Sequence, residues 1–165
     1  LLTLSEHFGH TDGLRVGWIG DGNNVCHSLI LASPMAGLEL TVAAPSRYRP
    51  DRGIVEAGRA AGAKIRVTGD PREAARDADV LYTDVWVSMG KEEEREERLS
   101  AFRGYTIDAS LLSLASPEAV VLHCLPAHRG EEITDEVLEG FQSIVWDQAE
   151  NRLHTEKALL LSLLG

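Results

Sequence analysis

Three short polar segments of this sequence carry residue types that can bind ligands or move protons. They are residues 20–24 (Gly-Asp-Gly-Asn-Asn), residues 84–90 (Asp-Val-Trp-Val-Ser-Met-Gly) and residues 123–130 (His-Cys-Leu-Pro-Ala-His-Arg-Gly). Each segment directly follows a short apolar, β-branched run that predicts a buried strand. In open α/β folds, ligands bind outside the carboxyl ends of the strands. We therefore expect the three segments to line one site.

The segment at residues 20–24 has several interpretations. Gly20 and Gly22 between a strand and a helix resemble the start of a dinucleotide fingerprint, but Val25 stands where a third glycine belongs. No acid ends the following strand either, although an NADP-binding variant could use Arg47. Alternatively, the glycines only shape a tight turn. Asn23 and Asn24 then either donate to an anion such as a carboxylate at the helix N-terminus, or Asn24 merely caps that helix.

The segment at residues 84–90 places Asp84 at a strand end and a hydroxyl, Ser88, four residues later. Trp86 and Met89 are apolar residues in the same predicted loop. A carboxylate and a hydroxyl so placed can receive an ammonium group. In the structural alternative, Asp84 caps a turn and Ser88 begins the next helix. The charged run that follows, residues 91–98, predicts a solvated helix face with i,i+4 ion pairs.

The segment at residues 123–130 carries the most reactive side chain. Cys124, beside His123, could serve as a nucleophile, a metal ligand or a proton acceptor, or it could be an inert buried thiol. A zinc site is not indicated, because the remaining candidate ligands, Cys26 and His27, lie on a predicted helix. No orienting His–Asn/Asp set for a cysteine hydrolase can be recognised. Whether Pro126 is cis does not follow from the sequence.

The predicted terminal helix, residues 151–164, raises two further questions. Arg152 near its start opposes the helix dipole, so it either meets an anionic or carbonyl partner or pairs with Glu150 or Glu156. The leucines of residues 159–164 exceed what one face of a sheet needs. We expect this helix to pack on something outside the 165 residues.

The elements between these segments alternate. We predict strands at residues 14–20, 39–44, 64–67, 80–85, 105–108, 120–123 and 143–146, and helices at 24–37, 54–62, from 70 onward, 91–102, 110–115, 134–138 and 151–164. Strands separated by helices form right-handed crossovers and a parallel sheet. The prediction is a single domain over residues 1–165. It has an α/β, doubly wound, mainly parallel and Rossmann-like sheet with helices on both faces.

Composition excludes several classes of function. The chain has 165 residues, a formal net charge of −10 and 44% hydrophobic residues, which suits one globular domain. The negative charge argues against a nucleic-acid partner and a basic membrane-binding face. No apolar run reaches the roughly 18 residues of a membrane-spanning helix. Two cysteines and no recognisable leader peptide favour the cytoplasm.

The three segments, together with residues 1–8 and 150–152, resemble the aspartate/ornithine carbamoyltransferase family in family order. Residues 88–90 (Ser-Met-Gly) and 123–126 (His-Cys-Leu-Pro) resemble the members that use ornithine. The resemblance implies transfer of a carbamoyl group from carbamoyl phosphate to the δ-amino group of L-ornithine, giving L-citrulline and phosphate. It also implies a homotrimer, no metal and no cofactor. The alternatives are a Rossmann-type nucleotide-binding oxidoreductase domain and a noncatalytic domain that kept the fold.

The resemblance implies a role for each matching residue that binds ornithine. Asn24 would hold the carboxylate of the amino acid, and Asp84 with Ser88 would hold its α-ammonium. Met89 would contribute mainly backbone groups.

The resemblance also implies the residues of the reaction itself. Cys124 would accept a proton from the attacking amine, and Cys124 with Leu125 would present backbone groups to carbamoyl phosphate. Arg152 would polarise the carbonyl of carbamoyl phosphate. The family's phosphate-binding Ser-Thr-Arg-Thr-Arg loop does not occur here, and residue 1 is not Met. We expect these residues to be the ornithine-binding half of a longer chain, inactive without the N-terminal carbamoyl-phosphate domain.

Overall fold

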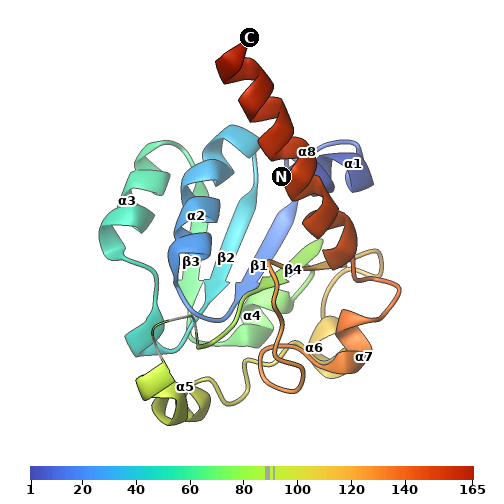
Figure 1. The fold of residues 1–165 in the computed structure, drawn as a ribbon. Helices are drawn as coiled ribbons and strands as arrows, with labels where there is room; N and C mark the ends of the chain where they lie inside the picture. The colour runs from blue at the N-terminus through green and yellow to red at the C-terminus, as the bar shows by residue number, and fades with distance from the viewer. Residues whose placement is uncertain (88–89, 91) are drawn as a thin grey trace.

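The sheet confirms the predicted fold class. In the computed structural model, which describes residues 1–87, 90 and 92–165, five parallel strands lie in the order β3-β2-β1-β4-β5 (Figure 1). Their bounds are β1 Arg15–Ile19, β2 Glu39–Ala43, β3 Lys64–Thr68, β4 Val80–Thr83 and β5 Val120–His123. The chain reverses its direction of travel across the sheet between β3 and β4, and such a switch point creates a crevice at the carboxyl edge.

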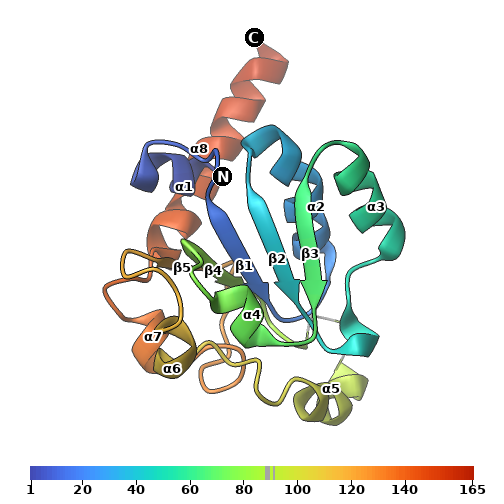
Figure 2. The same cartoon turned by 180° about the vertical axis from the view of Figure 1, so that it is seen from behind.

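Helices cover both faces of this sheet. The helices α2 and α3 lie on one face and α4, α6 and α7 on the other, as the two opposite views show (Figures 1 and 2). The helix bounds are α1 Leu2–Phe8, α2 Asn24–Ala36, α3 Arg52–Ala60, α4 Pro71–Ala75, α5 Arg95–Ala101, α6 Ala109–Leu112, α7 Asp135–Leu138 and α8 Val145–Leu164. Helix α1 is an addition that the sequence patterns did not predict.

Alternation along the strands explains the two-sided core. Trp18 packs into the hydrophobic cluster under α2, whereas its neighbour Ile19 packs into the cluster on the opposite face. Successive side chains of a strand point to opposite faces, so a strand covered on both sides must be apolar throughout. Gly17 precedes Trp18 in β1, and a Cβ there would stand 2.3 Å from the carbonyl oxygen of Ala74 in α4. Glycine at this position therefore lets α4 approach the sheet.

The last predicted strand, residues 143–146, is wrong. The segment contributes one bridge, Val121 with Ser143, and α8 then begins at Val145 instead of near residue 151. A further strand beside β5 would have bonded the backbone N–H of His123. The side chain of Gln148 accepts that N–H instead, at 3.0 Å. A side chain on the first turns of α8 thus satisfies the donor and makes a sixth strand unnecessary.

Two other predicted elements also differ. Residues 105–108 form no strand, because the backbone N–H of Ile107 bonds to the carbonyl of Glu132, outside the sheet. The charged stretch predicted as one helix at 91–102 contains a 3-10 turn at Glu92–Glu94 followed by α5.

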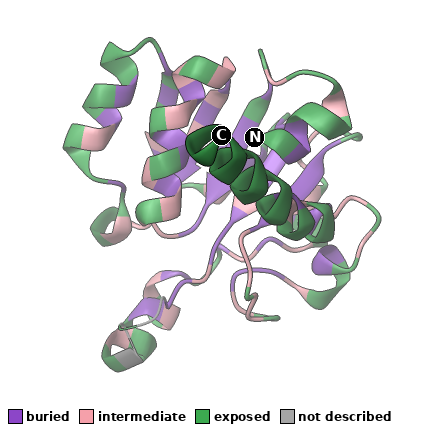
Figure 3. Ribbon diagram, turned by 45° about the horizontal axis from the view of Figure 1, so that its top comes forward, coloured by how far each residue is buried: buried purple, intermediate pink, exposed green. Residues whose placement is uncertain are grey.

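Helix α8 differs from the others in exposure. Among its residues only Val145 and Asn151 are buried, and its second half is coloured as exposed in Figure 3. That half extends away from the body of the molecule (Figure 1). Five leucines on that half are exposed: Leu159, Leu160, Leu161, Leu163 and Leu164. None of the helices in the described part of the chain combines the length and apolar character that a membrane span requires.

Candidate active site

The carboxylate of Asp84 is the centre of a cluster at the carboxyl edge of the sheet. Asp84 directly follows β4 and is 7% exposed. Its Oδ1 accepts the backbone N–H of Val85 at 2.8 Å and the thiol of Cys124 at 2.7 Å. Its Oδ2 accepts the Nδ2 amide of Asn23 at 2.6 Å. A carboxylate has about four acceptor positions. Three are used by described residues, two on Oδ1 and one on Oδ2.

Asn23 has a second task at the N-terminus of α2. Its Oδ1 accepts the backbone N–H groups of Val25 and Cys26, at 3.0 and 3.2 Å, and so caps the helix. Because Nδ2 of the same amide donates to Asp84, the cap also orients the carboxylate. The predicted cap at Asn24 is therefore one residue late. Asn24 is the first residue of α2 and is exposed.

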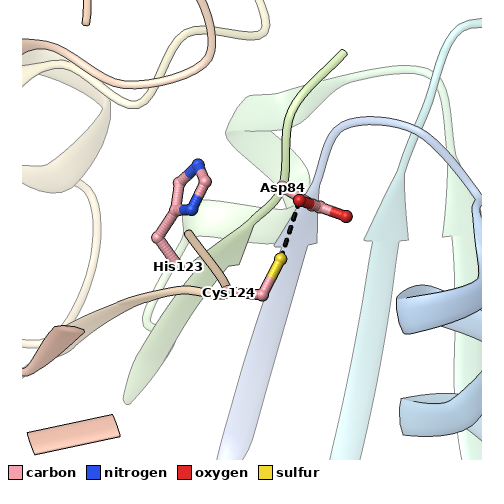
Figure 4. Close-up of side chains that lie close together, drawn as sticks. All are labelled: Asp84, His123 and Cys124. Atoms are coloured by element: carbon pink, nitrogen blue, oxygen red, sulfur yellow. Dashed lines mark hydrogen bonds between the residues drawn. The ribbon is translucent and has the colours of Figure 1, made fainter. Parts of the chain in front are cut away.

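The thiol of Cys124 is held in its protonated form. Burial and the neighbouring Asp84 carboxylate, which accepts its hydrogen bond, raise the pKa of Cys124 far above its usual range. Figure 4 shows the sulfur directed at Asp84 while the His123 ring stands apart from that pair. A thiol in this state is a hydrogen-bond donor and a poor base. Cys124 must lose its own proton before it can accept another.

His123 supports the segment that carries Cys124. Its Nδ1 accepts the backbone N–H of Leu125 at 2.8 Å, so Nε2 carries the proton and donates to Oε1 of Glu132 at 3.0 Å. Both His123 and Glu132 are fully enclosed, at 1% and 0% exposure. Leu125 has the unusual φ of +51° for a non-glycine residue, and the bond to His123 holds that conformation. The Leu125–Pro126 peptide bond is cis.

The structure brings together only some of the predicted site residues. Asp84 and Cys124 are hydrogen bonded to each other, Leu125 follows Cys124 directly, and Asn24 follows Asn23, which donates to Asp84. Arg152 lies on α8, where its Nε pairs with Glu156 at 2.8 Å and its side chain is 80% exposed. Of the two partners expected for Arg152, an anionic or carbonyl group elsewhere or a glutamate on its own helix, the structure shows the glutamate. Ser88 and Met89 lie outside the described residues.

Three participants were missed by sequence reasoning. Asn23 was predicted only as a donor to an anion together with Asn24, and its roles as helix cap and partner of Asp84 were missed, although Asn is a favoured residue directly before a helix. Glu132 and Gln148 carry no local signal, because each acts on His123 across the fold. Only a fold in hand reveals such partners.

Among the residues that the structure describes, two groups of side chains could supply metal ligands. Asp84, His123 and Cys124 offer ligand atoms within 4.8 Å of one another. Both ring nitrogens of His123 are already hydrogen bonded, however, and the Cys124 thiol is turned to Asp84. A metal there would have to break this network. The second group is His128, Glu131 and Glu132.

The glycines of residues 20–24 have a packing explanation. A Cβ on Gly22 would stand 2.1 Å from the backbone nitrogen of Pro50. The backbone of residues 49–50 thus occupies the space that a dinucleotide fingerprint leaves open for a pyrophosphate. Arg47, the alternative phosphate partner, forms an exposed ion pair with Glu97. The geometry of this segment favours the turn over the nucleotide interpretation.

Comparison with known proteins places these features in a family. The Asp/Orn binding domain of aspartate/ornithine carbamoyltransferases matches residues 12–163. The chain is 66% identical, over all 165 of its residues, to an ornithine carbamoyltransferase of Methanoculleus marisnigri, and 54% identical over 165 residues to one of Archaeoglobus fulgidus. It covers 53% and 54% of those proteins, so it spans about half the length of these relatives.

Solved structures show the same likeness. The crystal structure of an ornithine carbamoyltransferase from Thermus thermophilus matches with a TM-score of 0.89 at 51% identity, over 99% of this chain and 53% of that one. The Pyrococcus furiosus ornithine carbamoyltransferase matches with a TM-score of 0.90 at 46% identity, over 96% of this chain and 52% of that one.

Proposed function

Because the chain belongs to the aspartate/ornithine carbamoyltransferase family, we propose that the full-length protein transfers the carbamoyl group of carbamoyl phosphate to the δ-amino group of L-ornithine. The products are L-citrulline and phosphate. We further propose that residues 1–165 are one domain that supplies the ornithine-binding half of the site. The observation that carries this assignment is the buried Asp84 carboxylate, held by Asn23 and Cys124 at the carboxyl edge of the sheet.

Asp84 suits the α-ammonium group of an amino acid. The carboxylate is buried and already oriented by three hydrogen bonds, so an arriving ammonium group meets an acceptor that needs little rearrangement. A substrate without that ammonium would leave the carboxylate less well paired, which provides discrimination. Asn24, at the start of the 13-residue helix α2, is placed to receive the carboxylate of the same substrate. By family resemblance, Ser88 and Met89 complete this subsite.

The Cys124 thiol gives the reaction a defined order of events. An amine must lose a proton before or as it attacks a carbonyl carbon. While no cation neutralises Asp84, the Cys124 thiol stays protonated and cannot accept that proton. Burial is the larger cause of the raised pKa of Cys124 and persists, but the part due to Asp84 weakens once the α-ammonium of ornithine pairs with that carboxylate. The thiol then releases its own proton to solvent more readily, and the resulting thiolate can accept the proton of the attacking amine. Ornithine binding therefore prepares its own proton acceptor.

Carbamoyl phosphate is proposed to meet the other side of the cluster. Leu125 and Cys124 present backbone groups there, and Arg152 stabilises the oxyanion that develops on the carbonyl. In this structure Arg152 pairs with Glu156 on its own helix. Its role therefore requires the rest of the full-length protein, or the bound substrate, to draw the guanidinium away from Glu156.

The remainder of the longer protein is proposed to supply the carbamoyl-phosphate half of the site. The relatives are about twice as long as this chain, and the exposed leucines of α8 offer an apolar surface for that half. We also propose a homotrimeric, cytoplasmic enzyme. Light scattering of the full-length protein would test the trimer by its mass.

Citrulline formation by the full-length protein tests the proposed activity. We expect product only when L-ornithine and carbamoyl phosphate are both present. Asp84→Asn should raise the KM for ornithine at least about tenfold, because the charge that pairs with the ammonium is lost. Cys124→Ala should lower kcat by a factor on the order of 100. Unchanged citrulline production by both variants would support the noncatalytic alternative.

The 165-residue chain provides a second readout. Alone it should bind ornithine weakly and form no citrulline above an enzyme-free blank, and turnover by it would contradict the division of the site between two halves. Saturable NADP binding with no effect of ornithine would instead favour the nucleotide-binding alternative.

A further inference from the structure

Arg98 is a buried cation outside the cluster just described. It lies in α5 and is 7% exposed, and its guanidinium forms several contacts at once. Nη1 donates to Oδ2 of Asp21 at 2.8 Å and to the carbonyl oxygen of Trp86 at 3.0 Å. Nε donates to Oε2 of Glu94 at 2.9 Å. The guanidinium carbon also lies 4.7 Å from the centre of the Tyr48 ring, within the range of a cation–π contact.

These contacts join the two loops that carry the ornithine-binding residues. Asp21 belongs to the turn that leads from β1 to the capping residue Asn23, and Trp86 follows Asp84 by two residues. A single nitrogen atom of Arg98 holds both loops. The hydrogen bond between Asn23 and Asp84 spans the same two loops on the ligand side. Arg98 and the Asn23–Asp84 bond therefore both fix the distance between these two loops.

The arrangement depends on a guanidinium group. Burial raises the pKa of Asp21, and Arg98 opposes that rise, so Arg98 helps to keep the carboxylate charged. A lysine ammonium is a single point charge, whereas a guanidinium presents several donors in one plane. Removing the cation would leave a mostly buried carboxylate and a carbonyl oxygen without their partner, and buried unpaired groups are costly.

If Arg98 only stabilised α5, its bond to Glu94 within the same part of the chain would be enough. The bond to Glu94 is a local i,i+4 pair, and on its own it would do no more than support the start of the helix. The bonds to Asp21 and Trp86 reach residues 77 and 12 positions away in the sequence. Asp21 lies close in the chain to Asn24, and Trp86 to Asp84, which are two of the residues that we propose bind ornithine.

We propose that Arg98 is a positioning residue for ornithine: it holds the Asp21 and Trp86 loops together so that Asp84 and the N-terminus of α2 face one amino-acid ligand. The proposal rests on the proposed function, because that function names the ligand. Arg98 itself touches no reacting atom. Its loss should therefore weaken ornithine binding selectively, while the carbamoyl-phosphate subsite keeps its affinity.

Steady-state kinetics of the full-length enzyme test this. In Arg98→Gln we expect the KM for ornithine to rise at least about tenfold and the KM for carbamoyl phosphate to stay within about twofold. Arg98→Lys should fall between wild type and Arg98→Gln. The matched control is Arg47→Gln, which removes an exposed arginine that also pairs with α5 through Glu97 and should leave both constants within about twofold.

Other outcomes of these measurements would contradict the positioning role of Arg98. Equal rises in both KM values, or a lower melting temperature with unchanged constants, would show a merely structural role and overturn the proposal. If Arg98→Gln does not fold, Asp21→Asn removes one charge of the same pair and should raise the ornithine KM in the same selective way. An unchanged KM in that variant would also overturn the proposal.

Ornithine binding separates this inference from the proposed function. If the wild-type protein forms no citrulline, the proposed function fails. Calorimetric titration with L-ornithine then decides about Arg98 alone. Binding by wild type that weakens at least about tenfold in Arg98→Gln supports the positioning role, whereas equal binding, or no binding by either protein, overturns it.

Discussion

At the residue scale, the site is governed by one carboxylate that serves three donors. Asp84 orients the Asn23 amide, holds the Cys124 thiol and accepts a backbone N–H. Its charge keeps the thiol protonated, because a thiolate beside an anion is repelled and a buried thiolate is poorly solvated. The charge that we propose attracts an ammonium ligand therefore also suppresses the reactivity of the neighbouring thiol.

A substitution at Asp84 should show this coupling directly. In Asp84→Asn the negative charge disappears, so the raised pKa of Cys124 falls and the thiolate fraction at about pH 8 increases. We expect iodoacetamide to alkylate Cys124 faster in this variant, with the rate rising at a lower pH than in wild type. The measurement is the alkylation rate against pH by mass spectrometry.

The second cysteine supplies the control. Cys26 is fully buried in the core, so the rate in Cys124→Ala should be close to zero at every pH. An alkylation rate at Cys124 that is unchanged or slower in Asp84→Asn would show that Asp84 does not control this thiol.

At the element scale, α2 couples the stability of a helix to the geometry of the site. Its cap, Asn23, is also a donor to Asp84, whereas the cap of α3, Asp51, accepts the N–H of Ile54 and lies at the start of another helix. Both caps have the same local purpose. Only one of them contacts the cluster.

Replacing each cap by alanine should separate the two purposes. Asn23→Ala and Asp51→Ala should each lower the free energy of unfolding by about 0.5–2 kcal/mol, through loss of the cap. Only Asn23→Ala should also raise the KM for ornithine in the full-length enzyme. Urea denaturation and steady-state kinetics provide the two readouts, and equal kinetic effects from both variants would contradict the link between cap and site.

At the scale of the whole molecule, the exposed end of α8 is the main feature that the domain alone does not explain. Leu160 and Leu164 are 57% and 80% exposed, on a helix whose second half touches little of the body. Large exposed apolar patches mark surfaces that another protein segment covers. The proposed occupant is the other half of the longer chain.

Charged substitutions on α8 should reduce self-association in the 165-residue chain and lower the stability of the full-length protein. We expect the uncovered leucines to make the 165-residue chain self-associate. Leu160→Lys with Leu164→Lys should reduce that association, measured by analytical ultracentrifugation, because charged side chains replace the apolar ones. In the full-length protein the same pair should lower the melting temperature by several degrees, equivalent to about 1–3 kcal/mol of lost burial.

The control lies on another helix. Met35 of α2 is 86% exposed and apolar, and Met35→Lys should change neither measurement. A full-length protein that tolerates both lysines on α8 without loss of stability would show that this surface is not covered in it.

Much of this molecule follows from the sequence by itself. Alternating apolar runs and helical stretches predict the parallel, doubly wound sheet, and strand ends predict where polar segments 20–24, 84–90 and 123–130 meet. These features depend on residues that are close together in the chain, so the local pattern of apolar and polar residues is enough to predict them. Asp84 and Cys124 could be proposed as site residues for the same reason.

The tertiary structure decided which side chains touch. β4 lies between β1 and β5, so Asp84 meets Asn23 across 61 sequence positions and Cys124 across 40. It also decided that Gln148 replaces a strand beside His123. Strand order and long-range hydrogen bonds depend on how whole elements pack. For that reason no local pattern distinguished Asn23 from Asn24 as the partner of Asp84.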